Sequence, residues 1–150
     1  VVVDVRSYPG SRRNPQFGRD AMARWLPARG LAYRWEPRLG GRRKPRPDSR
    51  HMALRHAAFR AYADHMGSDD FREGLADLLA AAGQPSAVVC SESVWWRCHR
   101  RLLADAAVLL HGAEVVHLFH DGRLQPHPVT PEARVEAGEV VYDAGVQPLR

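Results

Sequence analysis

The sequence has no long apolar segment and few cysteines, and each absence excludes a class of protein. No run of about 18 apolar residues occurs in the 150-residue chain, so no membrane-spanning helix is predicted. The first residues, Val1 to Arg6, lack a basic region and a cleavage site, which argues against a signal peptide. Two cysteines, Cys90 and Cys98, are too few for a disulfide framework, so the cytosol is the expected compartment.

Lysine is nearly absent, and arginine carries the basic charge. Lys44 is the single lysine among 22 basic residues, which stand against 17 acidic ones and give a net charge of +5. Residues 1–50 hold 13 basic and 4 acidic residues, whereas residues 51–150 hold 9 and 13. Such a basic half favours phosphates or other anions as partners. The abundance of arginine is equally typical of a GC-rich genome, so charge alone does not establish an anion site.

Hydrophobic periodicity predicts strands that alternate with helices. Ser68 is expected to cap a central helix that carries Asp69 and Asp70 in its first turn and ends before Gly83. The segment 37–49, rich in glycine, proline and basic residues, is predicted to be a mobile loop. The expected strands are 1–6, 86–90 and 114–119, with weaker ones at 31–35 and 139–142, and the expected helices are 19–28, 52–66, 68–82 and 98–111.

This order of elements predicts an α/β fold, a single three-layer domain over residues 1–150 with a mainly parallel sheet flanked by helices. Residues 129–150 are expected to form an irregular tail. In such sheets, ligands bind beyond the carboxyl ends of the strands. The chain becomes polar at two of those ends, in the segments 4–7 and 90–92. These segments mark the predicted position of a functional site.

Four ordered blocks of sequence carry a resemblance to a known family. They are residues 4–17 (Asp-Val-Arg-Ser-Tyr-Pro-Gly-Ser onward), 39–42 (Leu-Gly-Gly-Arg), 59–66, and 90–105 (Cys-Ser-Glu-Ser-Val-Trp-Trp-Arg-Cys-His-Arg onward). With these blocks the chain resembles, over residues 1 to about 128, the bacterial family domain of unknown function 488. The resemblance implies an α/β fold and a site built from the first and last blocks, but no reaction.

The sequence departs from the family pattern at its start. Members usually open with a strand reading Thr-Ile-Gly-His-Ser ahead of the first block, and this sequence lacks that strand. Val1 to Arg6 itself reads as the start of a buried strand. We therefore expect that an upstream strand of the sheet, together with a histidine that lines the family's site, is missing from this chain.

Glu92, His99, Cys90 and Asp4 are the candidate catalytic residues. Glu92 follows a predicted strand, where a carboxylate serves as a general base or nucleophile, and His99 exchanges protons near neutral pH. The alternative for Glu92 is a residue of a helix N-terminus that the helix dipole stabilises. Cys90 is either a nucleophile with a lowered pKa or a small buried residue. Asp4 is either catalytic or the ion-pair partner of Arg6.

Arginines near both strand ends are the predicted anion-binding groups, because arginine offers paired donors to phosphate and a helix N-terminus adds backbone amides. We expect Arg6, Glu92 and Arg100 to line one cleft. The alternative is that Glu92 and Arg100 form a buried ion pair. Trp95 and Trp96 are expected to stack on a base or sugar, or one of them to pack on the core. The candidate binding residues are Arg6, Ser11, Arg12, Arg97, Arg100, Arg101, Trp95 and Trp96.

Cys90, Cys98 and His99 do not have the spacing of a familiar cysteine site. Zinc sites usually show paired, closely spaced ligands, which Cys-x7-Cys-His is not, so no bound metal is predicted. Cysteine phosphatase loops follow Cys-x5-Arg, but Trp96 occupies that position and Arg97 comes one residue later. The loop also lacks a glycine that would let its amides converge on an anion.

The sequence predicts an enzyme that acts on a phosphate-bearing substrate, either a nucleotide or a nucleic acid. In this interpretation Glu92 is the main acid–base group or nucleophile, His99 assists it, and arginines hold the anion. The first alternative is a non-catalytic nucleic-acid-binding module that uses the basic segment 42–50 and the tryptophans. A third interpretation is a small redox or metal protein that uses its cysteines. No cofactor is predicted, and the oligomeric state is left open.

Overall fold

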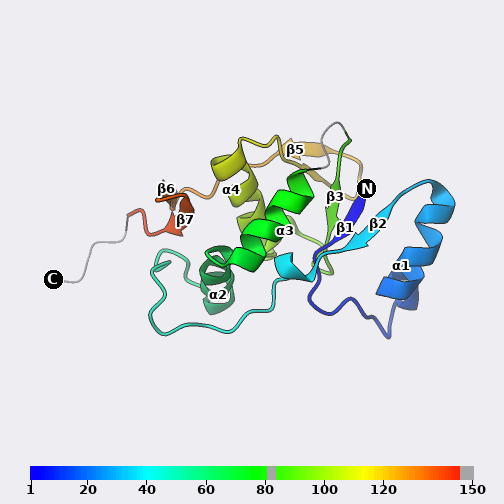
Figure 1. Ribbon diagram of the computed structural model, residues 1–150, viewed down its shortest axis with the longest axis horizontal. Coiled ribbons are helices and arrows are strands. Elements are labelled where there is room, and N and C mark those ends of the chain that lie inside the picture. The colour runs from blue at the N-terminus through cyan, green and yellow to red at the C-terminus, as the bar shows by residue number, and fades with distance from the viewer. Residues whose placement is uncertain (81–83, 146–150) are drawn as a thin grey trace.

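A three-stranded parallel sheet lies at the centre of the computed structural model, which describes residues 1–80 and 84–145 (Figure 1). β1 (Val2–Asp4) lies between β2 (Tyr33–Trp35) and β3 (Ala87–Val89), and both pairings are parallel. Because the three strands run in one direction, their carboxyl ends meet at one edge of the sheet. The predicted strands at 1–6, 31–35 and 86–90 are confirmed.

Helices pack against both faces of this sheet. They are α1 (Arg19–Trp25), α2 (Ala57–Met66), α3 (Asp69–Leu79) and α4 (Arg100–His111), with short 3-10 turns η1 (Pro15–Phe17), η2 (Pro27–Arg29), η3 (Pro37–Leu39) and η4 (Trp95–Arg97). Neighbouring strand residues point to opposite faces, so Val2 packs with Met22 and Leu26, whereas Val3 joins Phe71 and Leu102 in the main core. The predicted α/β class is confirmed.

None of the helices in the described ranges has the length and apolar composition that crossing a membrane requires.

Two helix ends follow the signals that the sequence gives. The Ser68 hydroxyl accepts a 3.2 Å hydrogen bond from a backbone N–H of the first turn of α3. Asp69 and Asp70 lie in that turn, where their charge is favourable for the helix dipole. Gly112 ends α4 with a left-handed φ of 61°. The expected helix end at Gly83 lies outside the described residues.

The helix predicted over 52–66 begins five residues late, at Ala57. The preceding segment, residues 52–56, is not helical, and its non-helical backbone still buries the side chain of Leu54 in the core. The Leu54 carbonyl oxygen accepts a 2.7 Å hydrogen bond from Arg60 Nη1, where a helix would supply a backbone N–H. His56 then caps α2, with its Nδ1 accepting a 3.3 Å bond from a backbone N–H. Side-chain hydrogen bonds replace the first expected turns.

The strand predicted at 114–119 does not join the parallel sheet. β4 (Val116–Leu118) pairs antiparallel with β5 (Leu124–Pro126) in a separate two-stranded sheet, across a turn in which Gly122 has a positive φ. Leu118 is 72% exposed, so the strand is not part of the buried core. An apolar run identifies a strand but does not specify its pairing partner, and a short turn favours the local hairpin.

Residues 129–145 form an ordered hairpin, which corrects the expected irregular tail. β6 (Ala133–Glu136) pairs antiparallel with β7 (Glu139–Tyr142), and Gly138 takes the left-handed conformation between them. Tyr142 is fully buried, and its hydroxyl donates a 2.9 Å hydrogen bond to Asp105 on α4. The hairpin therefore completes the core. The weak strand predicted at 139–142 is confirmed.

The basic segment 37–49 is held in place at its start. Leu39 is fully buried. Arg38 forms ion pairs of 2.7 Å with Glu36 and 2.5 Å with Asp77. Arg43 donates to three backbone carbonyl oxygens of this segment at 3.0–3.1 Å. The start of the predicted mobile loop is therefore anchored, because Arg38 and Arg43 make structural contacts there.

Candidate functional site

A cavity of about 230 Å³, here called the site cavity, lies beyond the carboxyl ends of β1 and β3. Its walls come from the loops after both strands, from the 39–42 block, from the start of α2 and from the residues that precede α4. Five of the predicted site residues line it: Arg6, Cys90, Glu92, Arg97 and His99. The edge of the sheet predicted from the sequence is therefore where a cavity forms.

Arg6 lines the site cavity with its charge already neutralised. Asp4 accepts two hydrogen bonds from the guanidinium, 2.8 Å from Nε and 2.6 Å from Nη2. Asp4 is fully buried, and the Tyr33 hydroxyl donates to it at 2.7 Å. The hydrogen bond from Arg6 to Asp4 raises the pKa of the guanidinium. Of the two interpretations of Asp4, the structure contains the buried ion pair, which leaves Nη1 of Arg6 for other contacts.

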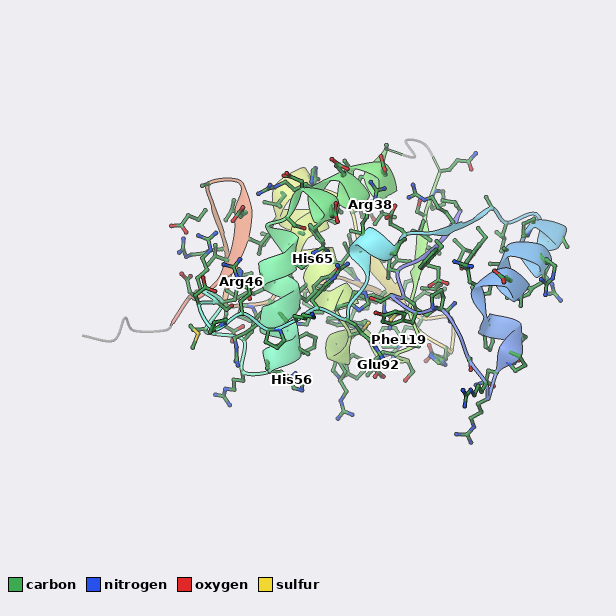
Figure 2. The ribbon with its side chains drawn as sticks, turned by 60° about the horizontal axis from the view of Figure 1, so that its bottom comes forward. Arg38, Arg46, His56, His65, Glu92 and Phe119 are labelled. Atoms are coloured by element: carbon green, nitrogen blue, oxygen red, sulfur yellow. The ribbon has the colours of Figure 1, made fainter. Side chains whose placement is uncertain are left out.

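Glu92 lies exposed in the loop after β3 (labelled in Figure 2) and lines the site cavity. Its Oε1 accepts a 3.0 Å hydrogen bond from the backbone N–H of Ser93. Arg100 donates to the backbone carbonyl oxygen of Glu92 and not to its carboxylate, so the alternative of a buried ion pair between them is not formed. Arg6 and Glu92 line the cavity, whereas Arg100 does not.

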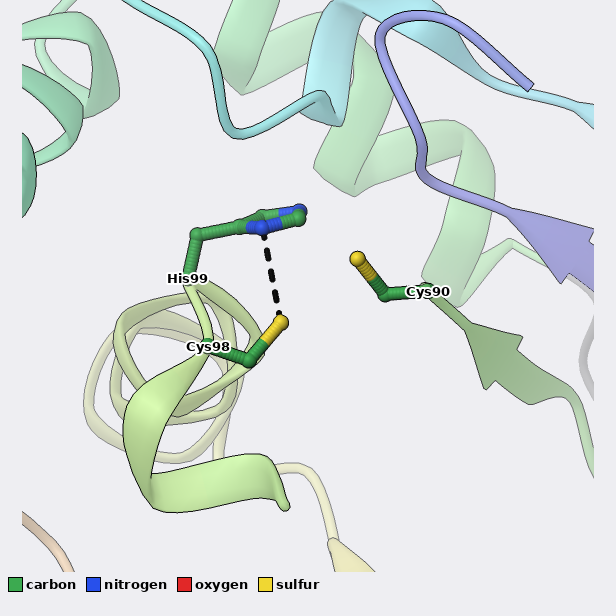
Figure 3. Close-up of side chains that lie close together, drawn as sticks. All are labelled: Cys90, Cys98 and His99. Carbon is green, nitrogen blue, oxygen red and sulfur yellow. Dashed lines mark hydrogen bonds between the residues drawn. The ribbon is translucent and has the colours of Figure 1, made fainter. Parts of the chain in front are cut away.

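Cys90, Cys98 and His99 come together at the site cavity (Figure 3). Cys90 follows β3, and the other two residues immediately precede α4. Cys98 Sγ lies 3.5 Å from His99 Nδ1 and accepts a 3.2 Å hydrogen bond from Nε of Arg100. The nearby Cys98 thiol lowers the pKa of Cys90, and the nearby Cys90 together with burial raises the pKa of Cys98. Two segments with no familiar sequence spacing therefore form one cluster.

Glycine in the 39–42 block allows the close approach of two site residues. A Cβ atom at Gly41 would lie 2.3 Å from Nδ1 of His99, and one at Gly40 would lie 2.4 Å from the Ser7 hydroxyl. The imidazole of His99 also packs against Tyr62, with the ring centroids 4.9 Å apart. The backbone of the block therefore fixes the position of the His99 ring, which a larger residue would displace.

We expect Gly41→Ala to lower the free energy of unfolding by about 1–3 kcal/mol, because the added methyl group overlaps the His99 ring. Chemical denaturation checks the value, and the ¹H–¹⁵N imidazole spectrum reports the displacement of the ring. Gly10→Ala is the matched control, because a Cβ there meets no atom within 4 Å. Equal stability of both variants, with an unchanged His99 spectrum, would contradict the prediction.

Six of the predicted binding residues lie outside the site cavity: Ser11, Arg12, Trp95, Trp96, Arg100 and Arg101. The Ser11 hydroxyl accepts a 2.9 Å backbone hydrogen bond that shapes its own loop, and Arg12 is exposed on that loop. Trp95 stacks on His117, with centroids 4.0 Å apart and planes 2° apart, whereas Trp96 remains 45% exposed. Trp95 therefore packs on a histidine of β4, and it is not among the residues of either core cluster in the described part of the chain.

Sequence reasoning did not single out Tyr8, Ser7, Phe59 or Gly41 as site residues, although all line the cavity. Tyr8 is 76% exposed, and the Arg42 guanidinium lies 5.9 Å from the centroid of its ring. The signal that identifies them is membership in the four blocks described above. The sequence places Arg42 in the basic segment 42–50, and in the structure its side chain lines the site cavity.

Comparison with known protein families shows where this chain belongs. A family model described as "Domain of unknown function DUF488" matches residues 1–107, a range that includes every residue lining the site cavity. The match ends before β4, earlier than the expected limit near residue 128. No curated protein matches the chain. No solved structure matches it either.

Proposed function

Because this chain belongs to the family described as domain of unknown function DUF488, whose description names no reaction, we propose its function from the site itself. The protein is an enzyme that acts on a phosphate-bearing substrate, a nucleotide or a nucleic acid. The observation that carries this proposal is one cavity that combines three arginines, a carboxylate and a cluster of sulfur and imidazole groups. Its setting is a single three-layer domain in the cytosol, where thiols stay reduced.

Arg42 and Arg97 are the main anion-binding groups in this proposal. Both are exposed at the site cavity, and neither forms an ion pair within residues 1–80 and 84–145. A guanidinium offers paired donors that match two phosphate oxygens. Arg6 contributes its remaining Nη1, since Asp4 binds its other donors. Two uncommitted positive charges at one cavity supply the attraction that an anionic substrate needs.

The site cavity is too small for a whole nucleotide, so we assign only the phosphate group to the cavity and the rest of the substrate to the surface around it. A volume of about 230 Å³ suits a phosphate group better than a whole nucleotide. A base or sugar then lies outside, where exposed Tyr8 at the cavity rim offers a stacking surface. Trp96 offers a second exposed aromatic ring one residue from Arg97.

Glu92 is the proposed acid–base residue. It is the carboxylate among the side chains that line the site cavity, and its Oε2 has no hydrogen-bond partner in the described part of the chain. Pure phosphate binding does not need a carboxylate, because its negative charge repels the ligand. A carboxylate beside an anion site therefore favours proton transfer over binding alone.

We expect Arg42→Ala and Arg97→Ala each to weaken binding of a mononucleotide by about 10–100-fold, because each removes a charge-assisted hydrogen bond. Isothermal titration with inorganic phosphate, nucleotides and short oligonucleotides measures the effect. Arg29→Ala is the matched control, since Arg29 is exposed on η2, away from the site cavity.

Equal losses in all three variants would mean that binding follows overall charge and not this cavity. Oligonucleotide binding with no conversion by the wild type, in a broad screen of phosphate esters, would favour the non-catalytic binding module. Either result overturns the proposed enzyme at this site.

A further inference from the structure

The cluster of Cys90, Cys98 and His99 has the form of a metal site. One ligand atom from each residue lies within 4.8 Å of the others. Figure 3 shows both sulfur atoms and the imidazole directed into one shared space, from the end of β3 on one side and the start of α4 on the other. Convergence of three soft donors from two separate elements is the arrangement that a bound cation requires.

One distance in the cluster matches tetrahedral zinc. Zinc–sulfur and zinc–nitrogen bonds of about 2.3 and 2.0–2.1 Å, at a tetrahedral angle, place the two donor atoms about 3.5 Å apart. The distance from Cys98 Sγ to His99 Nδ1 is 3.5 Å. No two ligand atoms of the cluster are more than 4.8 Å apart. A small movement of one side chain would therefore bring all three to tetrahedral distances.

A donor group next to the cluster orients one of its sulfur atoms. Arg100 Nε donates to Cys98 Sγ at 3.2 Å. Such donors around ligand sulfurs orient them and balance their charge. The imidazole of His99 is free to bind a ligand, because its buried Nε2 has no hydrogen-bond partner in the described residues and its Nδ1 faces Cys98 Sγ at 3.5 Å.

We propose that Cys90, Cys98 and His99 bind one zinc ion, with the fourth coordination position open to the site cavity. Two thiolates and an imidazole select zinc over magnesium or calcium, which prefer oxygen ligands. Three protein ligands with an open position are the pattern of catalytic zinc sites, where the ion polarises a bound group or lowers the pKa of bound water. His99 then acts as a ligand and not as a proton carrier.

A bound zinc ion also balances the charge of the two thiolates that ligate it. Two thiolates would repel the phosphate that Arg42 and Arg97 attract. A divalent cation cancels their charge, so that the arginines determine the sign of the field. Zinc binding itself is independent of the proposed function. The use of the open position for a phosphate-bearing substrate rests on that function.

The spacing argument against zinc applies to a different type of site. Closely spaced ligand pairs are typical of structural sites that enclose zinc with four protein ligands. Here two ligands are adjacent residues before a helix, and the third follows a neighbouring strand. The parallel pairing of β1 and β3 and the packing of α4 bring them together, and no local spacing records that contact.

The test is metal binding by the reduced, metal-free chain. We expect one equivalent of Zn²⁺ to bind in competition with a chromophoric chelator, and Co²⁺ to give sulfur-to-metal charge-transfer absorption. Cys90→Ser, Cys98→Ser and His99→Gln should each weaken binding by more than about 100-fold, since even outer-shell changes cost 10–100-fold. Arg100→Ala should weaken it by about 10–100-fold. His120→Gln, at an exposed histidine outside the cluster, should leave it unchanged.

Circular dichroism is used to check that each variant is folded. If Cys98→Ser unfolds, Cys90→Ser is the safer variant, because Cys90 is only half-buried. No stoichiometric zinc binding by the reduced wild type, or equal affinity in Cys90→Ser and His120→Gln, would overturn the proposal. Rapid formation of a Cys90–Cys98 disulfide in a protein that binds no zinc would support a redox site instead. The zinc titration contains no phosphate, so its result does not depend on the proposed function. A protein that binds zinc but fails to bind phosphate in the separate phosphate titration would count against the proposed function alone.

Discussion

Glu92→Gln is expected to slow conversion of the proposed phosphate-bearing substrate by about 10²–10⁴-fold, the usual contribution of a general acid–base group. Glutamine keeps the shape of the side chain, and its amide oxygen still accepts the hydrogen bond that Oε1 receives from Ser93. What it loses is the capacity to take up and release a proton. Binding of the substrate should persist, or tighten, because a negative charge leaves an anion site.

The stability of Glu92→Gln should stay within about 0.5 kcal/mol of the wild type, since Glu92 is exposed and forms no ion pair among the described residues. The measurement begins with a thermal-shift screen of nucleotides and oligonucleotides, followed by turnover assays of each stabilising compound. Glu114→Gln is the matched control at an exposed carboxylate outside the site cavity. Equal turnover by wild type and Glu92→Gln would remove Glu92 from the mechanism.

Asp4→Asn should lower the free energy of unfolding by about 3–5 kcal/mol, because it leaves the buried guanidinium of Arg6 without a counter-charge. Asp4 is fully buried and Arg6 is 9% exposed, so water cannot replace the lost carboxylate. The amide of asparagine also turns a donor group toward a side chain that only donates. A large loss of stability is therefore expected from a single atom's change.

Urea denaturation measures the effect. Asp20→Asn is the matched control, because its ion pair with Arg19 is exposed and should contribute less than about 1 kcal/mol. The double variant Asp4→Leu with Arg6→Met should recover part of the loss, since replacing both charges removes the unpaired group. A loss for Asp4→Asn no larger than that of the control would show that the buried pair contributes little to stability.

Local sequence predicted most elements but misjudged several boundaries and partners. The strands at β1 and β3, the Ser68 cap and the Gly112 helix end follow from apolar runs and single-residue preferences. The late start of α2 and the separate hairpin of β4 do not. Side-chain hydrogen bonds from Arg60 and pairing with β5 decide them, and hydrophobic periodicity does not encode such contacts.

The predicted site shows the same division. The sequence located it at the carboxyl ends of two strands, because parallel strands that become polar at their ends deliver those residues to one edge. It did not show that Arg6 is neutralised by Asp4, or that Arg100 donates to a backbone carbonyl and to Cys98 instead of to the Glu92 carboxylate. Residue type and spacing identify charged groups but leave their pairing undetermined.

The sequence by itself determined the α/β class, the edge of the sheet where the site cavity lies, and the residue types available there. Only the tertiary structure decided which of these residues meet. Gly41 contacts His99 across 58 positions of chain, and Cys90 contacts Cys98 because β3 and the start of α4 pack together. The physical reason is that periodicity and capping act within a few residues, whereas a site is assembled by packing between segments that the sequence separates.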